Sequence, residues 1–322
     1  MRIMIIGTGS IGSLFGSKLA LAGHEIIPYS SQIVSKVHHN HTISLEESDG
    51  TIQKIEDFYL VPPLPTYFSC STEDLPPVVI IATKAYDLSK VCRDYKQLLT
   101  RIPIIVLLQN GLGNERIVQK NFPDSTLYRL ITSHGASLDE FGVVHHTGQG
   151  PTMLCDMALE QNKSHSHRFN LTQTFLTALS EAGFDPMLFT DPEEAIWRKA
   201  LVNIGINAVG ALTRLPNGSL MHIPDLKKLV SLTVIEAYNL ARMMQIPLLD
   251  QETYLTSVFS VINATQDNKN SMLQDILKGN RTEIDFLNGK IVELGMEIDI
   301  ATPINSMLTH LIKGLEKREK ST

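Results

Sequence analysis

The sequence predicts an α/β protein, with a Rossmann-type dinucleotide-binding domain in residues 1–190 followed by an all-α domain in residues 191–322. Three observations predict this. In the first part, short apolar strands alternate with helices, which is typical of a parallel sheet covered on both faces. A glycine motif separates the first strand from the first helix. After residue 190 only helical periodicity remains.

The first elements form one unit of about 30 residues. Arg2–Ile6 is a short apolar strand, the glycine motif Gly7–Gly12 follows it, and Ser13–Ala22 has the apolar spacing of a helix. Gly23 ends that helix, and Glu25–Tyr29 is the next strand. A strand, a glycine loop, a helix and a second strand, in this order, are expected of a dinucleotide-binding fold.

The rest of the first domain continues the alternation. Strands are predicted at Val78–Ala82, Ile104–Leu108 and Leu127–Thr132, and helices at Leu88–Leu99 and Asn114–Asn121. Val143–His146 and Thr152–Cys155 are separated by glycines and a proline, so we expect them to pair as a hairpin. Phe184–Phe189 is expected to be the last strand.

The second domain is predicted to be helical. Its helical segments are Trp197–Asn207, Asp225–Met244, Glu252–Gln266 and Thr282–Leu294.

Composition restricts the class of protein. The chain has 322 residues, 43% of them hydrophobic, which is enough for two domains with sizeable cores. A net charge of −6 without a basic cluster argues against nucleic acid as a partner. Apolar runs are too short to span a membrane, and a strand at residue 2 leaves no room for a signal peptide. Three scattered cysteines are typical of a reducing compartment, so we expect a cytoplasmic protein; a homodimer is compatible with the sequence.

The glycine motif Gly7-Thr8-Gly9-Ser10-Ile11-Gly12 predicts a cofactor site. Gly7 permits the tight turn, Gly9 lets the backbone approach a pyrophosphate, and Gly12 lets the helix pack close to the sheet. The N-terminus of the following helix offers free N–H groups to the anion.

The end of the second strand is where such folds contact the adenosine ribose. An acidic residue there favours NAD, and a nearby Arg favours NADP. The segment here is Tyr29-Ser30-Ser31-Gln32, which contains neither. A standard NAD site is therefore disfavoured, and a serine hydroxyl such as that of Ser31 remains able to bind a 2′-phosphate.

Polar residues follow two of the predicted strands. Lys84 comes after Val78–Ala82, and Gln109-Asn110-Gly111 comes after Ile104–Leu108. Each could be an ordinary loop residue. Because ligands of such folds bind at the carboxyl edge of the sheet, the two together favour a shared cleft.

A polar stripe lies on the first predicted helix of the second domain. Lys199, Asn203 and Asn207 are four residues apart, so they share one face of a mostly apolar helix. A buried ammonium beside two carboxamides is costly unless the groups meet a partner, and a small polar substrate would be one.

Two further polar residues have an ordinary local interpretation. Ser271 is a plausible helix N-cap, and Glu283 a first-turn acid that complements a helix dipole. The histidines show no spacing typical of a metal site, so no metal is expected.

The chain resembles the ketopantoate reductase (2-dehydropantoate 2-reductase) family over nearly its whole length. The residues that carry the resemblance are Gly7–Gly12, Gly23-His24-Glu25, Thr83-Lys84-Ala85, Asn110-Gly111, Trp197-Arg198-Lys199 with Asn203 and Asn207, Pro216-Asn217-Gly218, Ser271–Asp275, Thr282–Asp285 and Asn288-Gly289. The most specific of these are the two motifs that begin at Ser271 and Thr282.

The resemblance implies reduction of the ketone of 2-dehydropantoate to (R)-pantoate with NADPH, on the way to pantothenate and coenzyme A. It implies that Lys199 is the general acid, that Asn203 and Asn207 orient the substrate, and that Glu283 anchors the substrate hydroxyl. It also implies that Ser271 binds the substrate carboxylate. For Ser271 and Glu283 the resemblance thus replaces the local interpretation as an N-cap and a first-turn acid. The remaining implied roles are Asn110 bridging cofactor and substrate, and Lys84 beside the cofactor.

One position departs from the family pattern. Ser31 stands where the family commonly has an Arg that holds the 2′-phosphate. Two other functions therefore stay open at this point: a reductase of a different branched 2-keto acid, and a nucleotide-binding sensor without turnover.

Overall fold

The computed structural model describes residues 1–29, 42–56, 58, 71, 73–140, 142–157, 165–189 and 191–319. Contacts between residues divide the chain into two compact units. The first contains Met1–Gln109 and Asn114–Pro192, and the second contains Asn110–Gly113 and Glu193–Thr322. Each unit is described by itself.

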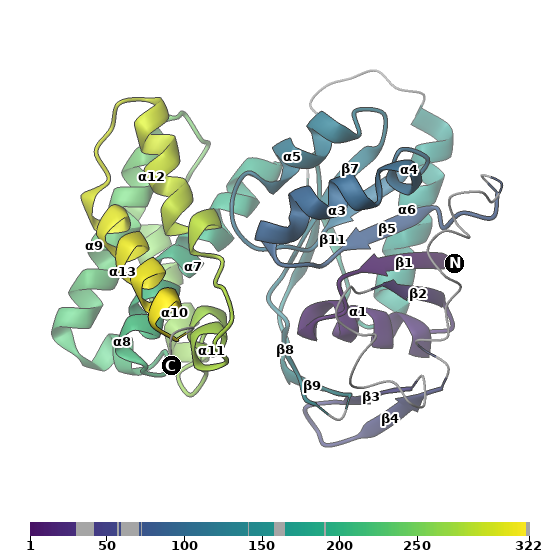
Figure 1. Cartoon of the computed structure of the whole chain (residues 1–322), viewed down its shortest axis with the longest axis horizontal. Coiled ribbons are helices and arrows are strands. Elements are labelled where there is room, and N and C mark those ends of the chain that lie inside the picture. Colours follow the sequence, from purple (N-terminus) through teal and green to yellow (C-terminus); the bar gives the residue numbers. More distant parts are fainter. Residues whose placement is uncertain are drawn as a thin grey trace. The chain divides into compact units, whose positions relative to one another are not determined.

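The first unit is built on a seven-stranded sheet in the order β11-β10-β7-β6-β5-β1-β2 (Figure 1). The strands are β1 (Arg2–Ile6), β2 (Glu25–Tyr29), β5 (Val78–Ile81), β6 (Ile104–Leu107), β7 (Thr126–Thr132), β10 (Thr152–Asp156) and β11 (Met187–Phe189). All neighbours are parallel except β7 and β10. The apolar runs of β5 and β6 are buried along their whole length, as expected for central strands of a covered parallel sheet.

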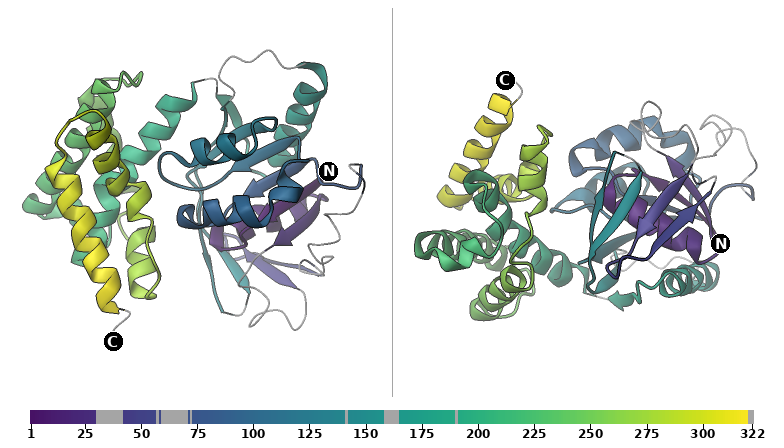
Figure 2. Two further views of the ribbon diagram at one scale, coloured as in Figure 1. Left: turned by 45° about the horizontal axis from the view of Figure 1, so that its top comes forward. Right: turned by 90° about the horizontal axis from the view of Figure 1, so that it is seen from below.

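Helices lie on both faces of this sheet (Figure 2). They are α1 (Ser10–Leu21), α3 (Leu88–Asp94), α4 (Lys96–Leu99), α5 (Asn114–Asn121) and α6 (His165–Glu181), with a short 3₁₀ turn η2 (Ala85–Asp87). The helix predicted over Leu88–Leu99 is divided in two at Tyr95.

A second, four-stranded sheet has the order β4-β3-β9-β8. Its strands are β3 (Ile43–Glu46), β4 (Ile52–Ile55), β8 (Gly135–Leu138) and β9 (Val143–Gly148). The buried residues Leu14 and Phe15 of α1 share one core with Ile3 of β1 and Leu45 of β3. α1 is therefore packed against both sheets.

The hairpin predicted between Val143–His146 and Thr152–Cys155 is wrong. β9 pairs with β3 and β8, whereas β10 pairs with β7 and β11. The two segments belong to one long bent hairpin, β7-β8 against β9-β10, whose turn lies near Gly142. Gly148–Pro151 is the bend at which the chain passes from one sheet to the other, and Ser133 N–H donates to the Pro151 carbonyl there at 3.0 Å.

The second unit contains only helices among its described residues. They are α7 (Pro192–Thr213), α8 (Ser219–His222), α9 (Pro224–Met243), α10 (Gln251–Ala264), α11 (Ser271–Leu277), α12 (Asn288–Glu297) and α13 (Pro303–Glu319), with a 3₁₀ turn η3 (Ile284–Phe286). The helix predicted over Thr282–Leu294 thus becomes η3 and α12. None of the described helices combines the length and apolar character that a membrane crossing requires.

Much of α7 is buried in this unit. A Cβ on Gly205 would lie 2.6 Å from Val234 of α9 and 3.6 Å from Val258 of α10. Glycine at this position therefore lets two helices pack closely on α7.

Candidate active site

The glycine loop between β1 and α1 uses its three glycines differently. Gly7 has φ +100°, and a Cβ there would lie 2.5 Å from the Thr83 nitrogen. A Cβ on Gly12 would lie 2.0 Å from the Gly7 carbonyl oxygen. A Cβ on Gly9, in contrast, would meet nothing within 4 Å. Glycine is thus required at positions 7 and 12 for close packing of the loop. At position 9 it leaves open space next to the backbone.

The start of α1 suits an anion. Its N-cap, Gly9, has no side chain to accept the first helical N–H groups, and the first turn has no acidic residue. The Thr8 hydroxyl is buried and has no hydrogen-bond partner among the described residues. Free donors, open space at Gly9 and an unsatisfied hydroxyl fit the pyrophosphate of a dinucleotide at this helix N-terminus. Ser31 lies outside the described residues.

The loops after β5 and β6 are tied together at the carboxyl edge of the sheet. The Gln109 carboxamide nitrogen donates to the Thr83 hydroxyl at 3.2 Å and to the Lys84 carbonyl at 3.5 Å. The buried Arg129 donates to the Gln109 carbonyl at 2.7 Å and pairs with Glu115 at 3.1 Å. The half-buried Lys84 is thus held close to the topological switch point between β1 and β5, where such folds bind dinucleotides.

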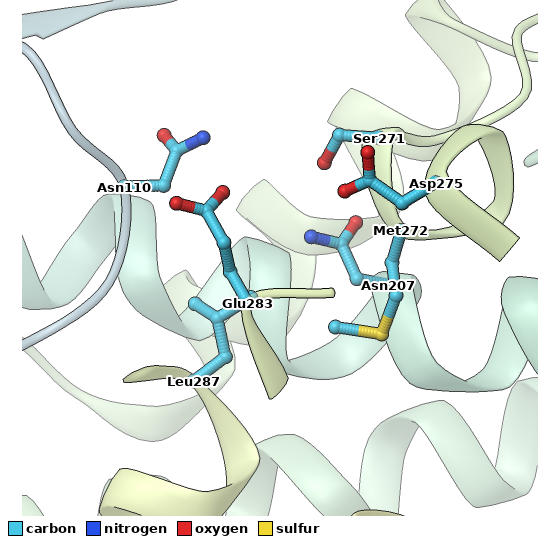
Figure 3. A pocket seen from close by; sticks show the side chains of 7 residues that line it. All are labelled: Asn110, Asn207, Ser271, Met272, Asp275, Glu283 and Leu287. Atoms are coloured by element: carbon cyan, nitrogen blue, oxygen red, sulfur yellow. The ribbon is translucent and has the colours of Figure 1, made fainter. Parts of the chain in front are cut away.

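A polar hollow lies in the helical unit (Figure 3). It is a shallow depression, partly open to solvent, and is lined by Asn110, Asn207, Ser271, Met272, Asp275, Glu283 and Leu287. The Glu283 carboxylate points toward the side on which Asn110 lies, and Ser271 and Asp275 enter from α11. Asn207, Asp275 and Glu283 are buried, so their polar groups are largely shielded from bulk water.

Local structure explains how these side chains converge. Asn207 comes from α7, Ser271 is the first residue of α11, and Asp275 lies one turn later. Glu283 precedes the 3₁₀ turn η3, so it is not in the first turn of α12. The N-cap of α11 is Asn270, so the local interpretation of Ser271 as a cap is wrong.

Asn110 reaches the hollow on a loop that packs against η3. Gly111 has φ +85°, and a Cβ there would lie 2.5 Å from the Phe286 carbonyl oxygen. The Leu112 N–H donates to the same carbonyl at 2.9 Å. A side chain at residue 111 would prevent this contact, so the glycine of Asn110-Gly111 positions the asparagine before it.

Lys199 and Asn203 lie on α7 with Asn207 but do not line this hollow. Both are half-buried, whereas Asn207 is buried. At 1.5 Å per residue, Lys199 lies about 12 Å along the helix axis from Asn207. The structure therefore brings together Asn110, Asn207, Ser271 and Glu283, and places Lys199 and Asn203 further along the same helix.

Asp275, Met272 and Leu287 were not predicted as site residues. Asp275 carries a detectable signal, because it is four residues after Ser271 and so shares its helix face. No comparable signal marks Met272 or Leu287. Among the described residues, no three His, Cys, Asp or Glu side chains are grouped to hold a metal ion.

Two protein-family models match this chain, one mainly over residues of the first unit and one mainly over residues of the second. Residues 3–158 match the family described as Ketopantoate reductase PanE/ApbA, and residues 191–316 match Ketopantoate reductase PanE/ApbA C terminal. The 2-dehydropantoate 2-reductase of Halobacterium salinarum is 29% identical over 317 residues, 97% of this chain and 98% of that protein.

Solved structures of similar fold include a dehydrogenase and a reductase. D-mandelate dehydrogenase with NADH and anilino(oxo)acetate is 26% identical, with a TM-score of 0.86 over 99% of each chain. A PanE/ApbA family ketopantoate reductase from Ralstonia eutropha JMP134 is 22% identical, with a TM-score of 0.81 over 99% of this chain and 100% of that one. Since the two family matches together span most of both units, this chain belongs to the ketopantoate reductase family.

Proposed function

We propose that the protein reduces 2-dehydropantoate to (R)-pantoate with NADPH. The observation that carries the proposal is the convergence of Asn110, Asn207, Ser271 and Glu283 on one polar hollow, in a chain of this family. These side chains offer amide and hydroxyl donors and a carboxylate acceptor. A small acid that carries a carboxylate, a ketone and a hydroxyl needs such a set.

Each polar side chain has a role that follows from its chemistry. The Ser271 hydroxyl donates to the substrate carboxylate, and the buried Glu283 carboxylate accepts from the substrate hydroxyl. Asn203 and Asn207 orient the substrate along α7. Lys199, as an ammonium, stabilises the negative charge that develops on the ketone oxygen and then donates a proton to it.

Residues of the first unit would bind the cofactor. Asn110 would contact both the cofactor and the substrate. Gly7–Gly12, including Thr8, Ser10 and Ile11, would hold the pyrophosphate, and Lys84 would lie beside the cofactor. When bound, the reduced nicotinamide supplies the hydride for C2 of the keto acid. We assign the 2′-phosphate to Ser31, as a hydroxyl donor in place of the family's Arg. A cytoplasmic location and a homodimer stay predictions.

A second candidate is reduction of a different 2-keto acid. The likeness to D-mandelate dehydrogenase favours it, because that protein acts on a 2-hydroxy acid and its structure contains NADH. Both candidate functions are the reduction of a 2-keto acid by a nicotinamide cofactor. They differ in the side group that the keto acid carries.

Cofactor oxidation at 340 nm, followed with several keto acids and with both nicotinamide cofactors, separates these functions. We expect the highest kcat/KM with 2-dehydropantoate and NADPH. A clear preference for phenylglyoxylate or 2-ketoisovalerate would assign the protein to the second candidate. Tight NADPH binding without oxidation of any keto acid would indicate a sensor and contradict both.

A further inference from the structure

We propose that Asn270 is a positioning residue that sets Ser271 opposite Asn207, and that Pro216-Asn217-Gly218 holds the segment leading to it. The inference rests on the proposed function, because it assigns Ser271 and Asn207 to the substrate. It gives a role to an asparagine outside the hollow, and to a motif that the proposed reaction does not use.

The Asn270 side chain joins two helices that carry hollow residues. Its Oδ1 accepts from the Leu273 N–H at 3.0 Å, which caps α11, and its Nδ2 donates to the Ile206 carbonyl at 3.3 Å. One bond therefore fixes the start of α11, where Ser271 lies. The other fixes that start against α7, one residue before Asn207. The side chain is buried, so water does not substitute easily for either bond.

α7 has space for this side chain because residue 210 is a glycine. A Cβ on Gly210 would lie 2.2 Å from Nδ2 of Asn270. Any larger residue at position 210 would push the carboxamide away from Ile206. Gly210 and Asn270 thus form a matched pair, in which the absence of one side chain makes room for the other.

The segment before Asn270 is held by the Pro216-Asn217-Gly218 motif. The Asn217 N–H donates to the Asn268 carbonyl at 3.0 Å, and the Gly218 N–H donates to the Gln266 carbonyl at 2.9 Å. The Asn217 carboxamide also donates to the Thr265 hydroxyl at 2.9 Å. These three bonds fix the chain between α10 and α11, so Asn270 enters α11 from a defined direction.

The test separates the two bonds of Asn270. In Asn270→Ser, a serine oxygen still caps α11, but the donor to Ile206 is lost. We expect KM for the keto acid to rise about tenfold, equivalent to ~1.4 kcal/mol. We expect kcat and the cofactor Kd to stay unchanged, because binding that is equal in ground and transition states affects KM alone.

Non-additivity distinguishes positioning from general destabilisation. If Asn270 acts through Ser271, the Asn270→Ser change adds no further rise in KM in a Ser271→Ala background. Gly210→Ala is expected to raise KM as Asn270→Ser does, and the double variant to be no worse than either single one. Additive effects in both cycles, or a wild-type KM in Asn270→Ser, would overturn the proposal.

A matched control is Asp250→Ser at the N-cap of α10, where Asp250 accepts from the Thr253 N–H at 2.9 Å. It changes a cap of the same kind and is expected to leave KM unchanged. Hydrogen exchange of residues 265–273 provides a readout that needs no substrate. We expect faster exchange there in Asn270→Ser and not in Asp250→Ser. Unchanged exchange overturns the positioning role, whereas an inactive wild type with the expected exchange overturns only the proposed function.

Discussion

Glu283 is the residue in the hollow whose role depends most on the identity of the substrate. It is buried, and its carboxylate faces the hollow from the chain just before η3 (Figure 3). A buried carboxylate needs hydrogen bonds, and the hydroxyl of 2-dehydropantoate would supply one. 2-Ketoisovalerate has no such hydroxyl, so the two acids separate this contact from all others.

Replacing Glu283 by Gln removes the charge and keeps the shape. We expect kcat/KM for 2-dehydropantoate to fall roughly 10- to 100-fold, because hydrogen bonds to charged groups contribute about 1.5–3 kcal/mol. The value for 2-ketoisovalerate should change much less. Glu293→Gln, at a position on α12 whose side chain is 56% exposed, is the control. Equal losses for both acids would show that Glu283 does not contact the hydroxyl.

At the scale of elements, the glycine loop separates packing from ligand binding. Gly9→Ala is expected to keep the melting temperature of the wild type, because φ is −73° at this residue and a Cβ there meets nothing within 4 Å. The same change should weaken cofactor binding, because the methyl group occupies the space that the pyrophosphate would use. Titration of cofactor fluorescence measures the change in Kd.

Gly12→Ala is expected to have the opposite effect to Gly9→Ala, because it disturbs packing. Its Cβ would lie 2.0 Å from the Gly7 carbonyl, so α1 must shift away from the loop. We expect a loss of about 1–3 kcal/mol in the free energy of unfolding, as for other overpacked positions. Thermal unfolding of both variants checks the pair. A destabilised Gly9→Ala variant with normal cofactor affinity would contradict the division of roles.

A partly buried network connects α1 to the four-stranded sheet. Glu47 accepts from Lys18 of α1 at 2.5 Å and from His146 of β9 at 2.6 Å, and His146 contacts His134 at 2.9 Å. The Phe184 ring packs edge-on against His134. Burial, and then the proximity of His146 and Lys18, lowers the pKa of His134 to about 4.

The lowered pKa predicts how stability depends on pH. In the unfolded chain, a histidine binds a proton below a pKa of about 6.5, whereas His134 in the folded protein stays neutral down to about 4. The unfolded state therefore binds more protons between these pH values, and the free energy of unfolding falls as the pH is lowered through that range. His134→Asn should flatten this fall in urea unfolding curves, and the exposed control His222→Asn should not. Parallel curves for wild type and His134→Asn would contradict the assignment.

For the whole molecule, local signals were sufficient for the fold class. The β1-loop-α1-β2 unit and the apolar runs of β5 and β6 were predicted from apolar runs and glycine positions. The pairing partners of β9 and β10 were not predicted. They depend on a bend at Gly148–Pro151, and sequence spacing does not distinguish such a bend from a hairpin turn.

Prediction of the candidate site divides in the same way. Helical spacing associated Asn207 with Lys199, but only tertiary packing brings Ser271 and Glu283 to Asn207. The break before α12 likewise depends on long-range contacts, since Asn288 Nδ2 donates to the Ile204 carbonyl of α7 at 3.2 Å and to Asn305 of α13 at 2.9 Å. Periodicity alone shows no break there.

The role of Lys199 as proton donor is the central claim, and Lys199→Ala tests it most directly. The measurement is kcat for the keto acid together with the cofactor Kd, compared with Lys228→Ala at an exposed position on α9. We predict that kcat falls by roughly 10²–10⁴-fold, the usual contribution of general acid catalysis, while the cofactor Kd stays that of the wild type. A Lys199→Ala variant that keeps most of its turnover would contradict the account.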